Sequence, residues 1–290
     1  MSGKAQAIAH GAATIVNAIA LGKGAAFGLD LWTKAEVRIT NEATTVTGTI
    51  RSDPEENTML IEKTVALIFR HFGVEKQFGA KVTTSSNIPI ARGLKSSSAA
   101  ANAVALATVA ALTEELDDLS VINLGVNAAF DAKVTVTGAF DDACASYFGG
   151  VVITDNSTRK LLQSFPLPDG LTVLLHVPTK KAYTGNTDVS RLATIKPAVK
   201  AAFEEAQSGN LWKALTQNGI AYSSALGYDN AIAEHALAAG ALAAGLCGKG
   251  PAVTVIVPDA KLGVVKAAMR SHEGIVLEAH FNSQKARVVI

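Results

Sequence analysis

The sequence predicts an α+β fold made of two domains. The chain has 290 residues, of which 49% are hydrophobic, and this is enough for one large domain or two of ordinary size. Strand-like and helix-like segments are mixed along the chain. The polar segment Asp155–Lys160 is the best candidate for a boundary. We therefore expect an N-terminal domain over residues 1–157 and a C-terminal domain over residues 158–290.

The N-terminal half contains the two periodicities that distinguish strands from helices. Alternating apolar and polar residues with β-branched side chains predict half-exposed strands. The apolar residues of Glu56–His71 recur at helical spacing and predict an amphipathic helix that begins near Asp53 and Pro54. The expected elements are strands Ala35–Ile39 and Thr45–Ile50, that helix, a strand Lys81–Ser85, helices Ala99–Leu112 and Ser120–Ala132, a loop Thr137–Ser146 and a strand Gly150–Ile153.

The C-terminal half has the pattern of a strand, several helices, a strand, a helix and a final strand. Leu171–Val177 is a continuous apolar run rich in β-branched residues, which is typical of a buried strand. The other predicted strands are Ala252–Val257 and Ala286–Ile290. The predicted helices are Ser190–Gly209, Asn210–Leu226, Asp229–Ala244 and Lys261–Ser271.

The composition argues against several classes of protein. The net charge is +1 and only 18% of the residues are charged, which argues against a disordered chain and against a nucleic-acid-binding surface. We therefore expect a small-molecule partner and no nucleic acid. The two cysteines, Cys144 and Cys247, are far apart and in no metal-ligand pattern, which fits a reducing, cytoplasmic compartment.

Three apolar segments raise the question of a targeting signal or a membrane span. Ala12–Leu21 resembles a short signal core, but Asn17 interrupts it and Gly22-Lys23-Gly24 follows in place of a clear cleavage site. We therefore expect no signal peptide. The alanine-rich segments Ala99–Leu112 and Ala231–Cys247 both contain polar residues, so they predict buried helices and no membrane attachment.

The segment Ile88–Ala101 is the most informative stretch of the chain. It reads Ile-Pro-Ile-Ala-Arg-Gly-Leu-Lys-Ser-Ser-Ser-Ala-Ala-Ala, a loop that runs into three serines and then into the alanine-rich helix. Free N–H groups and the positive dipole end of a helix form an anion site, to which Arg92 and Lys95 add charge. The segment predicts a phosphate-binding loop, and simple capping of the helix by the serines is the alternative.

Two common nucleotide-binding folds lack their motifs in this sequence. A P-loop NTPase requires Gly-x-x-x-x-Gly-Lys-Ser/Thr, but Gly22-Lys23 and Gly248-Lys249 are each followed by Gly. A dinucleotide-binding oxidoreductase requires Gly-x-Gly-x-x-Gly after an early strand, and none is present. If the serine segment binds ATP, it does so in another fold.

Two further loops carry residues suited to chemistry. Asp141 and Asp142 follow Gly138, and their adjacent carboxylates can hold Mg²⁺ or accept a proton from a substrate hydroxyl. The alternative is a helix cap. Gly248 and Gly250 lie between a predicted helix and a predicted strand, where glycine lets the backbone approach a ligand closely. The alternative there is an ordinary helix end.

The order of these three loops resembles the GHMP kinases, and the resemblance covers the whole chain. The matching motifs are Pro-x-x-x-Gly-Leu-x-Ser-Ser-Ser, Gly-x-x-Asp and Gly-x-Gly-Pro. The resemblance implies a GHMP kinase fold with an N-terminal ribosomal-S5-domain-2-like α/β domain and a C-terminal ferredoxin-like α+β domain. It also implies that ATP is bound, with Mg²⁺, by the residues Asn87, Ile88, Pro89, Ile90, Ala91, Arg92, Gly93, Leu94, Lys95, Ser96, Ser97 and Ser98.

Two departures from the general family pattern point to one branch of it. Lys95 replaces the usual Gly or Ser, and the N-terminal Pro-Gly-Arg/Lys signature is missing. The segment Gly11–Asp30, with Gly-Leu-Lys-Ser-Ser-Ser and Thr-Gly-Ala-Phe-Asp-Asp-Ala, is similar to the archaeal shikimate kinases. This resemblance implies ATP-dependent phosphorylation of the shikimate 3-hydroxyl. The alternatives are homoserine kinase, another small-alcohol kinase of the family, or a non-catalytic metabolite-binding protein of the same fold.

The expected roles follow from what phosphoryl transfer requires: neutralised phosphates, a well-placed hydroxyl and an acceptor for its proton. The loop N–H groups, the helix dipole and Lys95 supply part of the first requirement, and Mg²⁺ held by Ser97 or Ser98 supplies the rest. The family's Gly-x-x-Asp aspartate falls on Asp141, which is the expected base, with Asp142 as the alternative.

The shikimate carboxylate and hydroxyls require a cationic side chain and several hydrogen-bonding groups. The polar segment that begins at Lys180 and the N-terminal segment offer such groups, and the late glycine loop is implied by the family. The candidate substrate-binding residues are Asn17, Asp30, Lys181, Arg191, Gly248, Lys249 and Gly250. For the polar and charged residues among them, a solvated position is the alternative.

Overall fold

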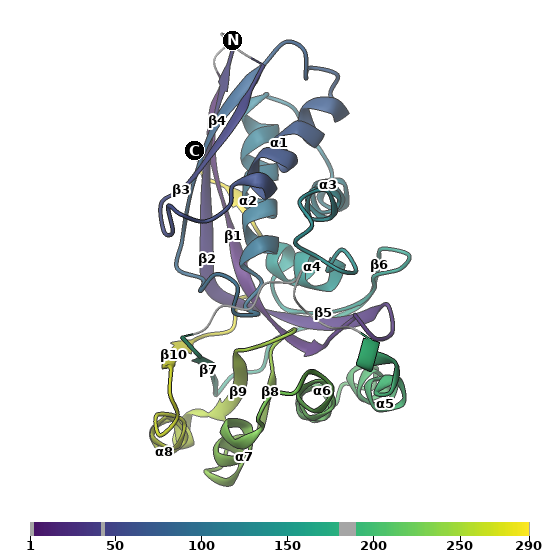
Figure 1. The fold of residues 1–290 in the computed structure, drawn as a ribbon, viewed down its shortest axis with the longest axis vertical. Helices are drawn as coiled ribbons and strands as arrows, with labels where there is room; N and C mark the ends of the chain where they lie inside the picture. Colours follow the sequence, from purple (N-terminus) through teal and green to yellow (C-terminus); the bar gives the residue numbers. More distant parts are fainter. Residues whose placement is uncertain (1–2, 42–43, 180–189, 290) are drawn as a thin grey trace.

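The computed structural model describes residues 3–41, 44–179 and 190–289. Two β-sheets, each covered by helices, lie one above the other along the long axis of the molecule (Figure 1). The first sheet has seven strands and the second has four. The predicted α+β class is therefore confirmed.

The first sheet is built around the two longest strands. Its order is β11-β1-β2-β4-β3, and β5 pairs with the start of β2 while β6 pairs with β5. All pairs are antiparallel except β3 with β4. The bounds are β1 Lys4–Val16, β2 Lys23–Thr40, β3 Val46–Ile50, β4 Gly79–Ser86, β5 Val151–Asp155, β6 Lys160–Phe165 and β11 Arg287–Val288.

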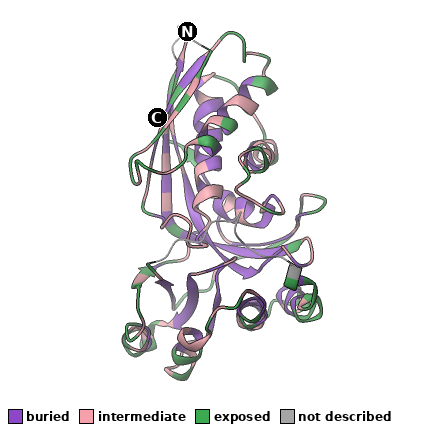
Figure 2. Ribbon diagram, viewed as in Figure 1, coloured by how far each residue is buried: buried purple, intermediate pink, exposed green. Residues whose placement is uncertain are grey.

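Four helices lie on one face of this sheet: α1 Met59–His71, α2 Ser96–Ala111, α3 Asp118–Asp131 and α4 Phe140–Phe148. α2 packs directly on the central strands, where small residues face one another. Ala7 and Ala9 of β1 share a buried cluster with Ala103 and Ala107 of α2. Alanine side chains let the helix backbone approach the sheet closely, so the position of α2 is fixed by dense packing. Figure 2 shows buried residues along both α2 and the central strands.

The second sheet has the order β10-β7-β9-β8, with all pairs antiparallel. Counting its strands along the chain, this is the order 4-1-3-2 of a split βαβ unit, so the predicted ferredoxin-like topology is confirmed. The strands are β7 Leu171–Val177, β8 Ala243–Leu246, β9 Val253–Pro258 and β10 Ile275–Ala279. The helices are η2 Ser190–Ala193, α5 Lys196–Gln207, α6 Leu211–Leu226, α7 Ala231–Ala238, η3 Asp259–Lys261 and α8 Leu262–Met269.

The two sheets share one hydrophobic core, because α5 and α6 pack between them. Val173 and Leu175 of β7 face this core, whereas Leu174 faces the cluster that α7 and α8 cover. The alternation follows from the two-residue period of a strand. Across the shared core, Phe27 of β2 meets Trp212 of α6 edge to face, with ring centroids 5.8 Å apart. The sheets are therefore held together by packing at their junction.

Some predicted elements are wrong. The predicted loop Thr137–Ser146 is mostly helix, because α4 begins at Phe140. The predicted helix Asp229–Ala244 ends at Ala238; Gly240 then turns the chain with a φ of +103°, and Ala243 begins β8. The predicted helix Ser190–Gly209 begins only at Lys196, after the short η2. Alanine favours helices, but pairing with β9 keeps residues 243–246 extended.

Several strands were not predicted at all: β1, the first part of β2, β6, β8 and β10. The buried positions of β1 include Ala5, Ala7, Ala9, Ala12 and Ala13, and alanine is a weak strand signal. The other predicted helices and strands are confirmed, with ends that differ by a few residues.

The polar segment Asp155–Lys160 forms the turn between β5 and β6, which pair with each other. Both strands belong to the first sheet, and β11 near the C-terminus also returns to it. The domain division at residues 157 and 158 remains a prediction. Among the residues that the structure describes, none of the helices combines the length and apolar character needed to cross a bilayer.

Candidate active site

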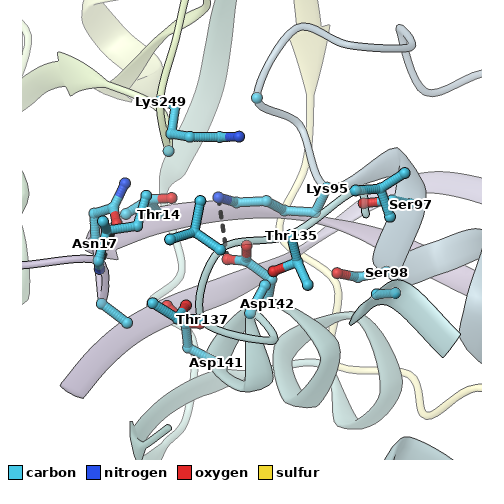
Figure 3. A pocket seen from close by; sticks show the side chains of 18 of the residues that line it. Thr14, Asn17, Lys95, Ser97, Ser98, Thr135, Thr137, Asp141, Asp142 and Lys249 are labelled. Carbon is cyan, nitrogen blue, oxygen red and sulfur yellow. Dashed lines mark hydrogen bonds and ion pairs between the residues drawn. The ribbon is translucent and has the colours of Figure 1, made fainter. Parts of the chain in front are cut away.

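A cleft of about 850 Å³, including its open mouth, lies where the serine segment, the start of α4, the β1–β2 turn and the late glycine loop meet. The structure brings together many residues predicted from the sequence. They are Asn17, Ala91, Gly93, Lys95, Ser96, Ser97, Ser98, Asp141, Asp142, Gly248, Lys249 and Gly250. Figure 3 shows Ser97 and Ser98 at one end, Thr14 and Asn17 at the other, and the charged side chains between them.

The N-terminus of α2 is open towards the cleft. Lys95, the residue before the helix, has a φ of +62° and provides no side-chain cap. Ala91 and Gly93 also have positive φ values, of 55° and 88°. In the described part of the chain, no protein acceptor is recorded for the backbone N–H groups of Ser96, Ser97 and Ser98. These N–H groups and the helix dipole make an anion-binding cradle, as the sequence predicted.

The late glycine loop packs directly on this cradle. The Ala252 N–H donates to the Arg92 carbonyl at 3.1 Å, and the Cys247 thiol lies 3.1 Å from the Gly93 carbonyl oxygen. A Cβ on Gly93 would fall 2.3 Å from the Cys247 carbonyl oxygen, so only glycine fits there. The contact places Gly248 and Lys249 beside Lys95 at the cleft.

The N-terminus of α4 also opens on the cleft, and Asp141 and Asp142 occupy its first turn. Ala139 precedes this helix with a φ of +50°. Two contacts hold α4 to α2. The Asn102 side chain of α2 donates to the Ala143 carbonyl at 3.0 Å, and Lys95 Nζ lies 3.0 Å from Asp142 Oδ1. The carboxylates are therefore held beside the phosphate cradle.

Asp141 is the buried carboxyl of the pair, with 3% of its surface exposed. Its Oδ1 accepts a hydrogen bond of 2.8 Å from Asn156 Nδ2. Burial, followed by the negative charge of Asp142, raises the pKa of Asp141 to about 7, although Lys95 and Asn156 oppose the shift. A carboxyl with a pKa near neutrality is suited to accept a proton at the working pH of most enzymes.

The two lysines of the cleft differ in charge environment. Burial lowers the pKa of Lys95, but the carboxylates of Asp142 and Asp141 outweigh it, so this pKa lies above its usual value. Burial and then the charge of Lys95 lower the pKa of Lys249 to about 8, against the opposing effect of Asp142. Lys95 is therefore a fixed cation, whereas Lys249 sits where an added negative charge would be stabilising.

The far end of the cleft is held by helix α6. The Asn17 N–H donates to Asn218 Oδ1 at 3.0 Å, and the Tyr222 hydroxyl donates to the Asn17 carbonyl at 3.0 Å. Asn17 Oδ1 accepts from the Ile19 N–H at 2.9 Å. Thr14 Oγ1 is buried beside them and has no hydrogen-bond partner among the described residues. This end offers polar groups to a ligand hydroxyl.

Other predicted binding residues lie away from the cleft. The Arg92 guanidinium donates to the carbonyls of Pro178, at 2.8 Å, and Thr179, so it does not face the cradle. Asp30 is exposed on β2 and accepts the His280 N–H at 2.9 Å. Arg191 is exposed in η2. Lys181 lies outside the described residues.

The first part of the serine segment is also placed elsewhere. The Asn87 side chain accepts the Trp32 N–H at 2.7 Å, and Ile88 and Leu94 are buried. Residues 87–90 and Arg92 line a second hollow, formed with the end of β7. The residues of the segment that reach the cleft are therefore Ala91, Gly93 and residues 95–98.

The sequence reasoning missed four residues around Asp141 and the far end of the cleft: Thr14, Gly24, Thr154 and Asn156. Thr14 and Gly24 lie within the segment that carries the family resemblance, but no motif singled them out. Thr154 directly precedes the polar segment Asp155–Lys160 that was predicted as the boundary, and Asn156 lies within it. Their closeness to Asp141 depends on the pairing of β2 with β5, for which the sequence has no local signal.

Comparison with known proteins assigns the family. The model of the GHMP kinases N terminal domain matches residues 59–150. The shikimate kinase of Methanosarcina mazei is 45% identical over 288 residues, covering 99% of this chain and 97% of its own length. The chain belongs to the archaeal shikimate kinase family of the GHMP kinases. The shikimate kinase of Pyrococcus abyssi is also 45% identical, over 87% of this chain and 90% of its own.

Solved structures of other GHMP kinases share the fold of this family member. Homoserine kinase from Cytophaga hutchinsonii superposes with a TM-score of 0.78 at 17% identity and covers 100% of this chain and 98% of its own. Methanococcus jannaschii mevalonate kinase also has a TM-score of 0.78, at 15% identity, covering 96% and 98%. The predicted two-domain GHMP kinase fold is confirmed.

Proposed function

We propose that this chain transfers the γ-phosphoryl group of ATP to the 3-hydroxyl of shikimate, giving shikimate 3-phosphate and ADP, in the biosynthesis of aromatic amino acids. The family relatives that cover nearly the whole chain are named shikimate kinases. The observation that carries the chemistry is the pairing of an open anion cradle at α2 with a buried carboxyl of pKa about 7 at α4. These features meet two of the three requirements of phosphoryl transfer to an alcohol, the neutralisation of the phosphates and the acceptance of the hydroxyl proton.

The triphosphate is proposed to lie on the N–H groups of Ser96, Ser97 and Ser98. The cradle fits this group because its three N–H groups have no recorded protein acceptor in the described chain and Gly93 leaves room for the loop. A third hollow, more apolar than the cleft, shares Ser96 and Ser97 with it and continues past them. Its apolar lining suits the nucleoside, and it includes Ile50, Met59, Leu60, Ile61, Ile90 and Ala100.

Mg²⁺ is proposed to bind at the hydroxyls of Ser97 or Ser98 together with phosphate oxygens. Magnesium typically takes one or two protein oxygens and completes its shell with phosphates and water. The site fits that pattern, since Ser97 and Ser98 line the cleft at the uncapped N-terminus of α2, where the phosphates are proposed to lie. When bound there, Mg²⁺ would neutralise charge on the β- and γ-phosphates.

Asp141 is proposed as the base. Its partner Asp142 is paired with Lys95, which leaves Asp141 as the carboxyl that lacks a cationic partner at ion-pair distance in the described structure. A proton from the acceptor hydroxyl therefore goes to Asp141, whose pKa of about 7 matches this task. Lys95 and the positive end of the α2 dipole stabilise the negative charge on the transferred group.

The acceptor is proposed to lie between Asp141 and the far end of the cleft. Lys249 is proposed to attract the shikimate carboxylate, because it is a cationic side chain that lines the cleft. Thr14 and Asn17 are proposed to bond ring hydroxyls. Gly248 and Gly250 keep the backbone of that wall close. The predicted role of Lys181 remains a prediction.

A cytoplasmic location is proposed with this function. Cys144 and Cys247 are both free and buried. Free thiols are typical of proteins that work in a reducing compartment.

The test is a coupled assay of ADP release with ATP and Mg²⁺ and four acceptors in parallel: shikimate, homoserine, mevalonate and galactose. We expect turnover with shikimate, strongly reduced in the Asp141→Asn variant, and a product identified by mass and NMR as the 3-phosphate. Faster turnover of homoserine than of shikimate would replace the proposed substrate with the alternative one. No turnover of any acceptor, by a folded chain that binds ATP, would contradict the proposed activity.

A further inference from the structure

Two buried polar side chains, Thr154 and Asn156, form a hydrogen-bonded series that ends at the proposed base. Thr154 Oγ1 donates to Asn156 Oδ1 at 2.7 Å, and Asn156 Nδ2 donates to Asp141 Oδ1 at 2.8 Å. Thr154 is fully buried, and Asn156 is 5% exposed. Buried polar groups joined in this way hold one another in a single orientation.

The direction of these hydrogen bonds follows from which groups can donate and which can accept. A threonine hydroxyl that donates to an amide oxygen fixes which end of the amide faces it, so the NH₂ group of Asn156 points at Asp141. The backbone of the same turn is also anchored, because the N–H groups of Asn156 and Ser157 donate to the Gly22 carbonyl at 2.8 and 3.2 Å. The turn between β5 and β6 is therefore docked on the turn between β1 and β2.

The two oxygens of Asp141 have different surroundings as a result. Oδ1 is occupied by the Asn156 amide. Oδ2 lies over Gly24, where an added Cβ would fall 2.3 Å from it. Glycine at this position leaves the space that Oδ2 fills. The carboxyl is therefore held by the Asn156 amide at Oδ1 and by the Gly24 backbone beside Oδ2. Oδ2 is the oxygen left for a substrate hydroxyl.

We infer that Asn156, oriented by Thr154, is the positioning residue that holds Asp141 with Oδ2 presented to the acceptor hydroxyl. The inference rests on the proposed function, in which Asp141 is the base. Misplacing a reacting group by about 1 Å costs on the order of 100-fold in rate, so a group that sets the rotamer of the base contributes through it. The amide also donates to the charged form of Asp141 and so favours it over the protonated form.

The pH dependence of the reaction is the readout that separates positioning from a merely structural role. The groups that act on the pKa of Asp141 are Lys95, which precedes α2, Asp142 from α4 and Asn156 from the β5–β6 turn. Cys144 and Tyr222 also lie close enough to respond to the charge of Asp141. Burial raises the pKa of both above the neutral range, so they stay protonated and do not contribute to the profile.

The experiment compares Asn156→Ala, Thr154→Val and Thr154→Ser in the full chain. We expect Asn156→Ala to lower kcat by about 10- to 100-fold and to move the acid limb of the kcat profile up by about one pH unit. The KM for ATP should stay near the wild-type value, because the cradle is not touched. Thr154→Val should produce smaller changes in the same direction. Thr154→Ser keeps the hydroxyl and should show the wild-type pH profile.

Asn123→Ala is the matched control. Asn123 contacts the same turn through Arg159, at 3.2 Å, but does not reach Asp141. We expect it to leave the acid limb unmoved. An Asn156→Ala variant with lower melting temperature and kcat but an unmoved acid limb would overturn the inference. If Asn156→Ala does not fold, the two Thr154 variants decide, and equal profiles for Val and Ser would also overturn it.

The outcome can be separated from a failure of the proposed function. The profile is measured with whichever acceptor the wild-type enzyme phosphorylates, so a wrong substrate does not affect the reading. Full turnover by Asp141→Asn would remove the base from the proposed function. In that case a kcat loss in Asn156→Ala would have another origin, and the inference would fall with it.

Discussion

Two helices, α2 and α4, point their N-termini into the same cleft. Both have a positive dipole end there, but only α4 carries negative side chains in its first turn. Both follow a residue with positive φ, Lys95 or Ala139, and neither has a side-chain cap. α2 begins with three serines and carries no acidic residue in its first turn. α4 begins with Phe140 and two aspartates.

The difference determines what each helix can do. A helix start without its own anion leaves its dipole and N–H groups for an anion from outside, which suits a phosphate. A helix start that carries carboxylates satisfies its dipole internally and presents oxygens to the cleft. The Lys95–Asp142 ion pair crosses from one helix to the other at 3.0 Å. Donor binding and proton acceptance are therefore assigned to separate helices that are held together.

The roles of the two helix starts are tested most directly by removing the charges of Asp141 and Asp142 in α4 one at a time. Asp141→Asn should lower kcat by about 100- to 10,000-fold, because it removes the proton acceptor, while the Kd for ATP stays near normal. Asp142→Asn should have the smaller effect on kcat and the larger effect on ATP binding, since it frees Lys95. Steady-state kinetics with calorimetric titration of ATP measures both. A larger kcat loss in Asp142→Asn would exchange the two roles.

The link between the helices is tested by Lys95→Met. The change leaves Asp142 nearly buried without its cation, and a stranded buried charge costs about 3 kcal/mol of the free energy of unfolding. The Kd for MgATP should rise about tenfold or more. The double variant Lys95→Met, Asp142→Asn should recover stability in denaturant titrations but not ATP affinity. Recovery of both would mean that Lys95 serves only the ion pair.

The geometry of the α2 cradle is tested by Gly93→Ala. Alanine disfavours the φ of +88° and its Cβ would meet the Cys247 carbonyl, so the expected loss of stability is about 2 kcal/mol, with weaker ATP binding. Gly263→Ala is the control, because no atom outside its own helix lies within 4 Å of the added Cβ. It should stabilise α8 by about 0.5–1 kcal/mol. Thermal unfolding with and without ATP gives both values, and equal behaviour of the two variants would contradict the packing argument.

The burial of Asp141 should make the free energy of unfolding depend on pH. Because the pKa of Asp141 is raised to about 7, its charged form is disfavoured in the folded chain, and stability is lost as the pH rises from about 4 to 7. Asp141→Asn should therefore be more stable than the wild type at pH 8, where the wild-type carboxyl is charged in the folded and the unfolded chain. The difference should disappear below pH 4. Denaturant titrations at both pH values measure it, and a variant less stable at pH 8 would contradict the raised pKa.

The local motifs of the site could be predicted because each depends on neighbours in the chain. The serine segment and the paired aspartates lie at helix starts, and helix ends have short-range signals. The late glycine loop was expected after a helix but joins β8 to β9, and its glycines alone made it recognisable. Fold class followed from periodicity for the same reason. Arg92 shows where this reasoning fails: it adjoins the cradle in sequence, yet its guanidinium bonds the carbonyls of Pro178 and Thr179.

The strands that were missed have a common physical cause. β1 and β8 are rich in alanine, whose propensity favours helix, and the pairing with β2 and β9 decides their conformation. The alanines of β1 become informative only beside the alanines of α2, with which they form one buried cluster. The alanines of β1 and those of α2 lie far apart in the sequence, so no local pattern contains both.

The chemistry available to this protein could be predicted from its sequence: a phosphate-binding loop within residues 87–98, adjacent carboxylates at 141 and 142, and the kinase family that the order of its motifs resembles. Only the tertiary structure distinguished the two carboxylates. Asp142 is paired with Lys95, and Asp141 is buried against Asn156. Burial and charge pairing depend on residues far apart in the chain, so neighbouring aspartates with the same local sequence acquire different properties.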